Sequence, residues 1–143
     1  MAENVDWYVH EILAQVDAAA TKKEKIDILQ KSDTMVLKNI LFGTFDDSIE
    51  WDLPKDPPPY RPCEVYDAPS SLNNQLSNFP YFVVGGIGKN LLKSKREEMF
   101  IRMLESIHPE DAKIVLWMIA RKLPIKGLTK ALVKEAFPTL LRQ

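Results

Sequence analysis

The stretch TKKEKIDILQKSDTMVLKNILF, residues 21–42, decides the fold class of this chain. It begins with a capping box, in which the hydroxyl of Thr21 accepts a hydrogen bond from the amide of Glu24 and the Glu24 carboxylate reaches back. A second start signal, Ser32-Asp33-Thr34, precedes another helical pattern that continues to about Phe45. Two helix starts so close together predict a small helical unit.

Amphipathic helical patterns continue on both sides of this stretch, with apolar residues recurring at three- and four-residue steps. They predict helices over residues 5–16, from about Lys89 to Ile107, and from Pro109 through Ala120, and a last short helix that Gly127-Leu128-Thr129 opens and Pro138 closes. In the helix from Lys89, the residues expected to point inward are Leu91, Leu92, Met99, Phe100, Met103, Leu104 and Ile107. Its charged residues, Arg96 among them, are expected mainly on the solvent side.

The middle of the chain breaks the helical pattern. Six of the ten prolines lie within residues 54–69, a density that excludes helix and favours polyproline II structure with turns. Ser70-Ser71 begins a short helix after them, and residues 79–84 fit either a strand or a packed aromatic segment. We therefore predict an all-α fold, in which one compact multi-helix domain spans residues 1–143 and contains an acidic, proline-rich excursion over residues 46–70. A length of 143 residues with 45% apolar content fits one core.

Composition excludes several classes of protein. The longest apolar run, around Tyr81–Val84, is far too short to span a bilayer, and residues 1–6 lack the basic start of a secretory signal. We therefore expect a cytoplasmic protein without a membrane partner. The single Cys63 cannot form an internal disulfide, and two distant histidines give no zinc-binding spacing. Neither a metal nor a cofactor is expected.

No combination of residues indicates catalysis. The Gly-rich stretch Gly85–Asn90 departs from a phosphate-binding loop, because Val83 stands where the first glycine would be and Asn90 replaces the magnesium-binding Ser or Thr. His108, before a proline, fits a helix cap better than a general base, and His10 has no partner motif. The adjacent Asp46-Asp47 is typical of a solvated pair after a helix end. We predict that the chain is not an enzyme.

Charge is distributed unevenly along the chain. Residues 1–88 hold 7 Lys and Arg against 14 Asp and Glu, whereas residues 89–143 hold 12 against 6. Such asymmetry suggests either a basic face for nucleic acid or a bipolar protein that docks to a partner. The basic residues gather near the C-terminus, where Lys126, Lys130 and Lys134 repeat every four positions and Gly127 and Thr129 could contact a phosphate. A merely solubilising role for these lysines is the open alternative.

Two separated parts of the sequence resemble a known DNA-binding domain. The stretches Thr21–Asp33, Leu37-Lys-Asn-Ile-Leu41 and Thr44-Phe45 resemble the opening of the N-terminal DNA-binding domain of T-even-type phage ATP-dependent DNA ligases. Ile114–Pro138 resembles the closing helices of that domain, in which a basic helix end leads through a Gly-containing turn into a short helix ending in an aromatic residue and proline. The whole chain is also similar to a family of small uncharacterised proteins of T-even-like tailed phages, especially those infecting cyanobacteria.

The ligase resemblance covers roughly residues 7–53 and 95–141, and it implies a helical domain that lies along the DNA backbone across the minor groove. Phosphate contacts would come from the turn before the last helix, at Lys122, Lys126, Gly127, Thr129 and Lys130. The chain has no Lys-x-Asp-Gly motif, so the adenylate-accepting lysine of a ligase is missing. The resemblance thus implies a stand-alone, non-catalytic module in the cytoplasm of an infected host cell.

Two functions follow as hypotheses. The first is a phage accessory protein that binds the backbone of duplex or nicked DNA with little sequence preference. Its candidate nucleic-acid-binding residues are Arg121, Lys122, Lys126, Gly127, Thr129, Lys130 and Lys134.

The alternative is an adaptor that binds a phage or host replication or transcription protein through the acidic, proline-rich segment. Its candidate contact residues are Trp51, Asp52, Tyr60 and Tyr66. The structural alternative is a loop that packs Trp51 and Tyr60 onto the helices and binds no partner.

Overall fold

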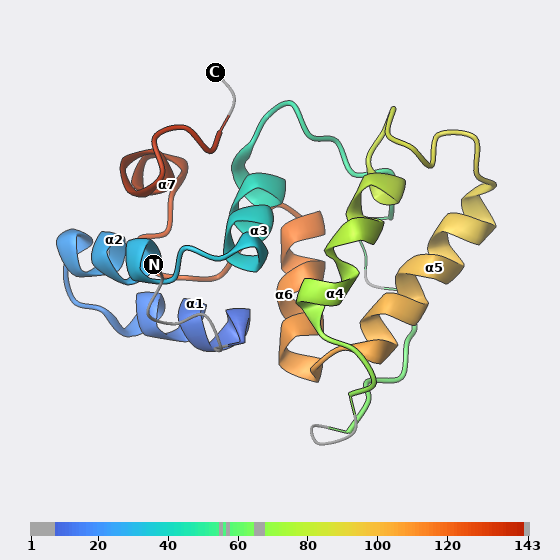
Figure 1. Ribbon diagram of the computed structural model, residues 1–143, viewed down its shortest axis with the longest axis horizontal. Helices are drawn as coiled ribbons and strands as arrows, with labels where there is room; N and C mark the ends of the chain where they lie inside the picture. Colours follow the sequence, from blue (N-terminus) through green and yellow to red (C-terminus); the bar gives the residue numbers. More distant parts are fainter. Residues whose placement is uncertain (1–7, 55, 57, 65–67, 142–143) are drawn as a thin grey trace.

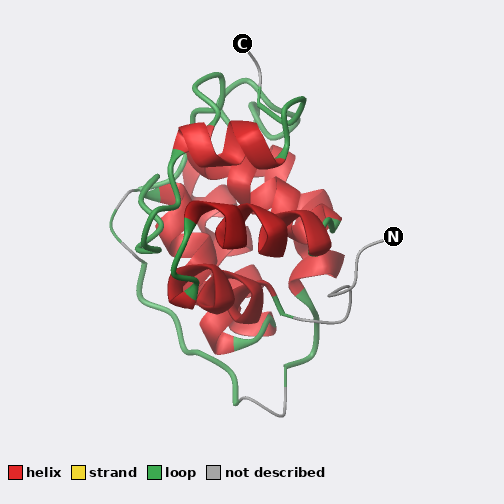
Figure 2. Cartoon of the chain, turned by 90° about the vertical axis from the view of Figure 1, so that its left-hand side faces the viewer, coloured by secondary structure: helices red, strands yellow, loops and turns green. Residues whose placement is uncertain are grey.

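The computed structural model describes residues 8–54, 56, 58–64 and 68–141, and these residues confirm the all-α prediction. They form α1 (Val9–Ala18), α2 (Lys22–Lys31), α3 (Met35–Phe45), α4 (Leu72–Gln75), the 3-10 helix η1 (Leu76–Phe82), α5 (Lys93–Ser106), α6 (Pro109–Ile119) and α7 (Lys130–Ala136). Figure 2 shows helices through the body of the molecule and no strand in the described part of the chain.

The helices are arranged around a central pair. Helix α3 packs against α6, and α1 packs against both α2 and α6. Helix α7 packs on α2, so that the last helix lies beside the second. Figure 1 shows α1, α2 and α7 on one side of the central pair and α4, η1 and α5 on the other. The two ends of the sequence therefore build one side of the molecule together.

Short-range caps begin four of the α-helices. Thr21, Thr34, Ser71 and Thr129 each accept a hydrogen bond from the amide three residues ahead, at 3.1, 3.3, 3.2 and 3.2 Å. The Glu24 carboxylate does reach back, but it accepts from the amide of Ala20 rather than from that of Thr21. The ring Nδ1 of His108 accepts from the amide of Glu110, which confirms the predicted cap of α6.

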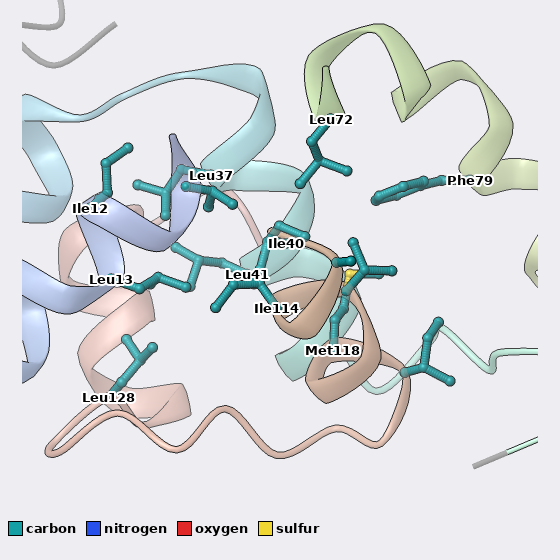
Figure 3. Close-up of a cluster of buried hydrophobic side chains, with 14 of the residues drawn as sticks. Ile12, Leu13, Leu37, Ile40, Leu41, Leu72, Phe79, Ile114, Met118 and Leu128 are labelled. Atoms are coloured by element: carbon teal, nitrogen blue, oxygen red, sulfur yellow. The ribbon is translucent and has the colours of Figure 1, made fainter. Parts of the chain in front are cut away.

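Apolar side chains from helices on both sides meet in one buried cluster. Figure 3 shows Ile12 and Leu13 of α1 facing Leu37 and Leu41 of α3, with Leu128 entering from the segment between α6 and α7. These five side chains are among those almost inaccessible to solvent. Because Leu128 belongs to this cluster, the segment that precedes α7 is held against the core.

The start of α5 differs from the prediction. The helix begins at Lys93 rather than near Lys89, because residues 83–91 form successive turns. Leu92, expected to point inward, is 75% exposed. Arg96, expected in solvent, is buried because its guanidinium donates hydrogen bonds to the carbonyls of Tyr81 and Gly88. Side-chain periodicity identifies Arg96 as part of a helix and Leu92 as apolar. It cannot show which carbonyls accept hydrogen bonds from the arginine.

The stretch 79–84 resolves into two short features. The 3-10 helix η1 continues to Phe82, and Val83 then forms a single antiparallel bridge with Trp51. The amide of Asp52 donates to the carbonyl of Phe82, and the amide of Val84 donates to that of Glu50. The predicted helix over residues 5–16 is described from Val9 onward, and Val5 lies outside the described residues.

Gly43 lies at the tightest contact between α3 and its neighbours. Its carbonyl accepts a hydrogen bond from the indole nitrogen of Trp51, at 2.8 Å. A Cβ at this position would lie 2.6 Å from Cζ2 of Trp51 and 2.7 Å from Sδ of Met118. The missing side chain is what lets Trp51 and α6 approach α3.

We predict that Gly43→Ala destabilises the fold. Helix propensity alone would make alanine better by about 1 kcal/mol. Overpacking against Trp51 and Met118 should instead lower the free energy of unfolding by about 1–3 kcal/mol, measured by urea denaturation. Asn39→Ala, at a half-buried position of α3 whose side chain donates only to the Met35 carbonyl, should stay within about 0.5 kcal/mol of the parent chain. A Gly43→Ala chain that is more stable than the parent would contradict this packing.

Candidate nucleic-acid interface

Arg121 sets the direction of the segment between α6 and α7. This residue has a φ of 61°, in the left-handed region, and directly follows the end of α6. Its guanidinium donates hydrogen bonds to the carbonyls of Asp46 and Ile49, at 2.7 and 2.9 Å. Of the predicted DNA-binding residues, Arg121 is therefore turned inward, toward the segment that leaves α3.

The Asp46-Asp47 pair divides into a buried and an exposed residue. The expectation that both are solvated is wrong for Asp46, which is fully buried and accepts hydrogen bonds from the amide and the hydroxyl of Ser48. Asp47 is exposed and pairs with Lys130 of α7. The hydrogen bond from Lys130, together with the charge of that lysine, holds the pKa of Asp47 below its ordinary value of 3.8.

The predicted basic residues fall into two groups. Lys130 is engaged with Asp47, and the Thr129 hydroxyl accepts from the amide of Leu132 as the cap of α7. Lys122, Lys126 and Lys134 are exposed, and none has a carboxylate within 4 Å in the part of the chain that the structure describes. These three carry charge that the molecule itself does not neutralise.

A hollow of about 370 Å³ opens between α2 and the start of α7. Lys22 and Lys25 line it from α2, and Gly127 and Thr129 line it from the segment before α7. Gly127 has a φ of 72°, and a Cβ there would lie 3.0 Å from Cε of Lys25. Only glycine combines this conformation with so close an approach. The backbone of Gly127 and the Lys25 side chain are thus fitted to each other.

Lys25 is buried although it is charged, with 8% of its surface exposed. Its ammonium donates to the carbonyl of Val16 near the end of α1, at 2.7 Å, and this carbonyl also accepts from the amide of Ala19. No carboxylate of the described residues pairs with it. An ammonium carries three donors, so this one keeps donors for an anion in the hollow.

The acids around the hollow limit its charge. Lys22 pairs with Glu135 of α7, at 2.6 Å between Nζ and Oε1. A carboxylate oxygen of Asp17 accepts from the amide of Lys126, at 2.8 Å, and ties this segment to the end of α1. Lys22 and Lys25 were missed as candidates because they lie in the acidic half of the sequence. Their i, i+3 spacing on one face of α2 was the available signal.

The alternative site is built into the fold. Trp51 is half-buried, donates to the Gly43 carbonyl and contacts Phe79 edge-on, with ring centroids 6.0 Å apart. Asp52 pairs with the buried Arg96, at 3.2 Å. These two candidates for partner binding therefore hold the excursion onto the helices.

Of the remaining candidates for partner binding, only Tyr60 lies in the described part of the chain. Tyr60 is half-buried against the core, and this burial raises the pKa of its hydroxyl. Tyr66 lies outside the described residues. The proline-rich segment is also tied by the amide of Arg61, which donates to a carboxylate oxygen of Glu105 at 2.7 Å. Packing thus accounts for Trp51 and Tyr60, whereas Asp52 and several of the described residues after it remain exposed.

The two histidines lie close together, although sequence reasoning identified no partner for His10. Their ring centroids lie 4.5 Å apart, and Tyr8 contacts both rings. The buried carboxylate of Asp111 accepts from the amide of His10 and lies 2.7 Å from its Nδ1. Asp111 thereby caps the first turn of α1 from α6. Within the described residues, no three His, Cys, Asp or Glu are grouped to hold a metal ion.

Comparison with known proteins places the chain in a family. A family of unknown function, DUF6433, matches residues 12–124, which is most of the chain. The chain belongs to DUF6433. The match runs from α1 through Lys122 and ends before Gly127, so the DUF6433 region contains Lys22 and Lys25 but not the start of α7. No curated protein matches the chain. No helix in the described part of this DUF6433 chain is long and apolar enough to cross a membrane.

The Asp47–Lys130 pair gives a prediction for pH. A lowered pKa means that the pair stabilises the fold above pH 3.8 and that this contribution is lost as the pH falls through the pKa of Asp47. In an NMR titration, the Asp47 carboxyl should have its midpoint below 3.8 and move up toward that value in Lys130→Ala. Lys134→Ala, on the same helix, should leave the midpoint unchanged. Equal midpoints in the parent chain and Lys130→Ala would refute the pair.

Proposed function

We propose that this chain is a non-enzymatic protein that binds the phosphate backbone of duplex or nicked DNA. In this proposal it is a stand-alone relative of the ligase-type DNA-binding domain, produced by a tailed phage and acting in the host cytoplasm. Its site is the hollow lined by Lys22, Lys25, Gly127 and Thr129, together with the exposed Lys126 beside it and with Lys122 and Lys134.

The buried ammonium of Lys25 is the observation that carries the proposal. A charge removed from water is usually paired with an opposite charge, and this one has only a backbone carbonyl as its partner among the described residues. A DNA phosphate placed in the hollow would supply the missing negative charge. Phosphate contacts of this kind position a protein on DNA without reading the bases.

The exposed lysines extend the same surface. The amide of Lys126 is fixed by Asp17, so this residue is held next to the hollow by a tie to α1. Lys134 lies four residues after Lys130 on α7, whose Glu135 contacts Lys22. A backbone that crosses the hollow would meet lysines from α2, from the α6–α7 segment and from α7. Association by such contacts releases counterions and weakens steeply with salt.

We predict salt-sensitive binding to a fluorescent nicked duplex and to its intact counterpart, measured by anisotropy. With about four phosphate contacts, a fourfold rise in salt should lower the affinity about a hundredfold. The double variant Lys126→Glu/Lys134→Glu breaks no ion pair of the described structure. It should lower the slope of log affinity against log salt concentration by the equivalent of about two phosphate contacts.

The matched control is Lys89→Glu/Lys93→Glu, which changes the net charge equally at two exposed lysines that likewise have no carboxylate within 4 Å among the described residues. It should retain most of the affinity. Equal losses in the two double variants would mean that only net charge matters, and the site would be refuted. No binding at low salt would refute DNA binding and return attention to the acidic, proline-rich segment as a protein ligand.

A further inference from the structure

Residues 84–95, the loop before α5 and its first turn, expose aliphatic side chains to solvent. Six large hydrophobic residues are exposed in the described part of the chain, and three of them lie here. Val84, Ile87 and Leu92 are 48%, 65% and 75% exposed. Single exposed hydrophobic residues need no explanation, but several in one short loop mark an interaction surface.

The loop is held in this form by the buried Arg96. Its guanidinium donates to the carbonyls of Gly88 and Tyr81, at 2.8 and 3.2 Å, and pairs with Asp52. Only 5% of the Arg96 surface is exposed. Because these contacts fix the backbone on both sides of Ile87, its side chain is held in the solvent and cannot be buried by a small rearrangement of the loop.

The residues at the start of α5 are not those that favour the beginning of a helix. Leu92 is the N-cap of α5 and has no capping hydrogen bond, although Ser, Thr, Asp or Asn would stabilise this position. Lys93 and Lys95 occupy the first turn, where the helix dipole disfavours cations. Local choices that oppose stability are expected at functional surfaces.

The sequence of this region carries only positive charge. Residues 68–96 contain no Asp or Glu, and Lys89, Lys93 and Lys95 are exposed. From outside the region, Glu98 pairs with Lys95 and Asp52 pairs with Arg96, which leaves Lys89 and Lys93 without a carboxylate within 4 Å among the described residues. The fitting partner therefore presents negative charge next to apolar material. Gly85 borders open space, since a Cβ there would meet nothing within 4 Å, and the side chains of Val84 and Ile87 on either side of it are exposed.

We propose that residues 84–95 dock the protein on the surface of an anionic lipid bilayer. Exposed aliphatic side chains and exposed lysines in one short segment match the surface of such a bilayer, where phosphates lie next to acyl chains. Ile87 and Leu92 enter the boundary between headgroups and acyl chains, while the lysines meet lipid phosphates. Such binding lies in the plane of the interface and needs no membrane-spanning helix. The proposal therefore departs from the expectation of no membrane partner, which rested on the lack of a membrane-spanning run and of a secretory signal in the sequence.

This surface is separate from the proposed DNA site. Figure 1 shows the loop before α5 and helix α7 toward opposite ends of the long axis of the molecule. Variants in the loop therefore leave the hollow at Gly127 untouched. Lipid binding and DNA binding can fail independently, and each has its own measurement.

The test is co-sedimentation of the full chain with vesicles of phosphatidylcholine alone or mixed with phosphatidylglycerol. The parent chain should bind the anionic vesicles at least tenfold more tightly than the neutral ones. Ile87→Ser/Leu92→Ser should lose at least tenfold of this affinity, and Lys89→Gln and Lys93→Gln about fivefold each. Met35→Ser, which removes an exposed apolar side chain on α3, is the matched control and should bind as the parent does.

Thermal unfolding establishes that each variant is folded before its affinity is compared. Absence of binding to anionic vesicles by the parent chain would overturn the proposal. Equal binding by the parent and by Ile87→Ser/Leu92→Ser would overturn it as well. A loss of duplex DNA affinity in the double serine variant, without any loss of vesicle binding, would identify the loop as a DNA contact instead.

Discussion

The guanidinium of Arg121 is the interaction on which the candidate site depends. It donates hydrogen bonds to the carbonyls of Asp46 and Ile49, which follow α3, and so fixes the end of α6 against that segment. With its backbone in the left-handed region, Arg121 ends the helix and turns the chain toward α1 and α2. Leu128 then enters the core, and Gly127 is brought over the side chain of Lys25. Loss of this arginine contact would free the start of the segment, whereas Asp17 would still hold Lys126 and the core would still hold Leu128.

Cations withdrawn from solvent perform the same structural task at three places. The half-buried Arg121 and the buried Arg96 and Lys25 each donate to backbone carbonyls of loops or helix ends, as a second hydrogen bond beside the one from a nearby amide. Arg96 and Arg121 also have a carboxylate nearby, at Asp52 and Asp47. Lys25 has none among the described residues, and it lines an open hollow. This difference is the physical basis for proposing that an anion belongs there.

Sequence reasoning succeeded where the deciding contacts are short. The caps at Thr21, Thr34 and Thr129 each involve an amide three residues ahead, so the residue type and its spacing are sufficient to predict them. The candidate site was predicted only in part, because Gly127 and Lys126 were found but Lys25 was not.

The missed contacts share a cause. The partners of Arg96, Arg121 and His10 lie well outside a local sequence window, so periodicity assigned the charged residues to solvent. Leu92 was assigned to the core for the same reason, since apolar character says nothing about where a helix begins. Burial of charge and exposure of aliphatic side chains both arise from tertiary contacts that no local pattern contains.

The most direct test of the account is an NMR titration of the 15N-labelled chain with a short DNA duplex. If the hollow binds the DNA backbone, the largest amide shifts will be at Gly127, Thr129 and the first turns of α2. These shifts will be lost in Lys25→Met, which keeps the side-chain length but removes the charge. The largest shifts in the segment from Trp51 to Glu64, with the hollow unchanged, would contradict it.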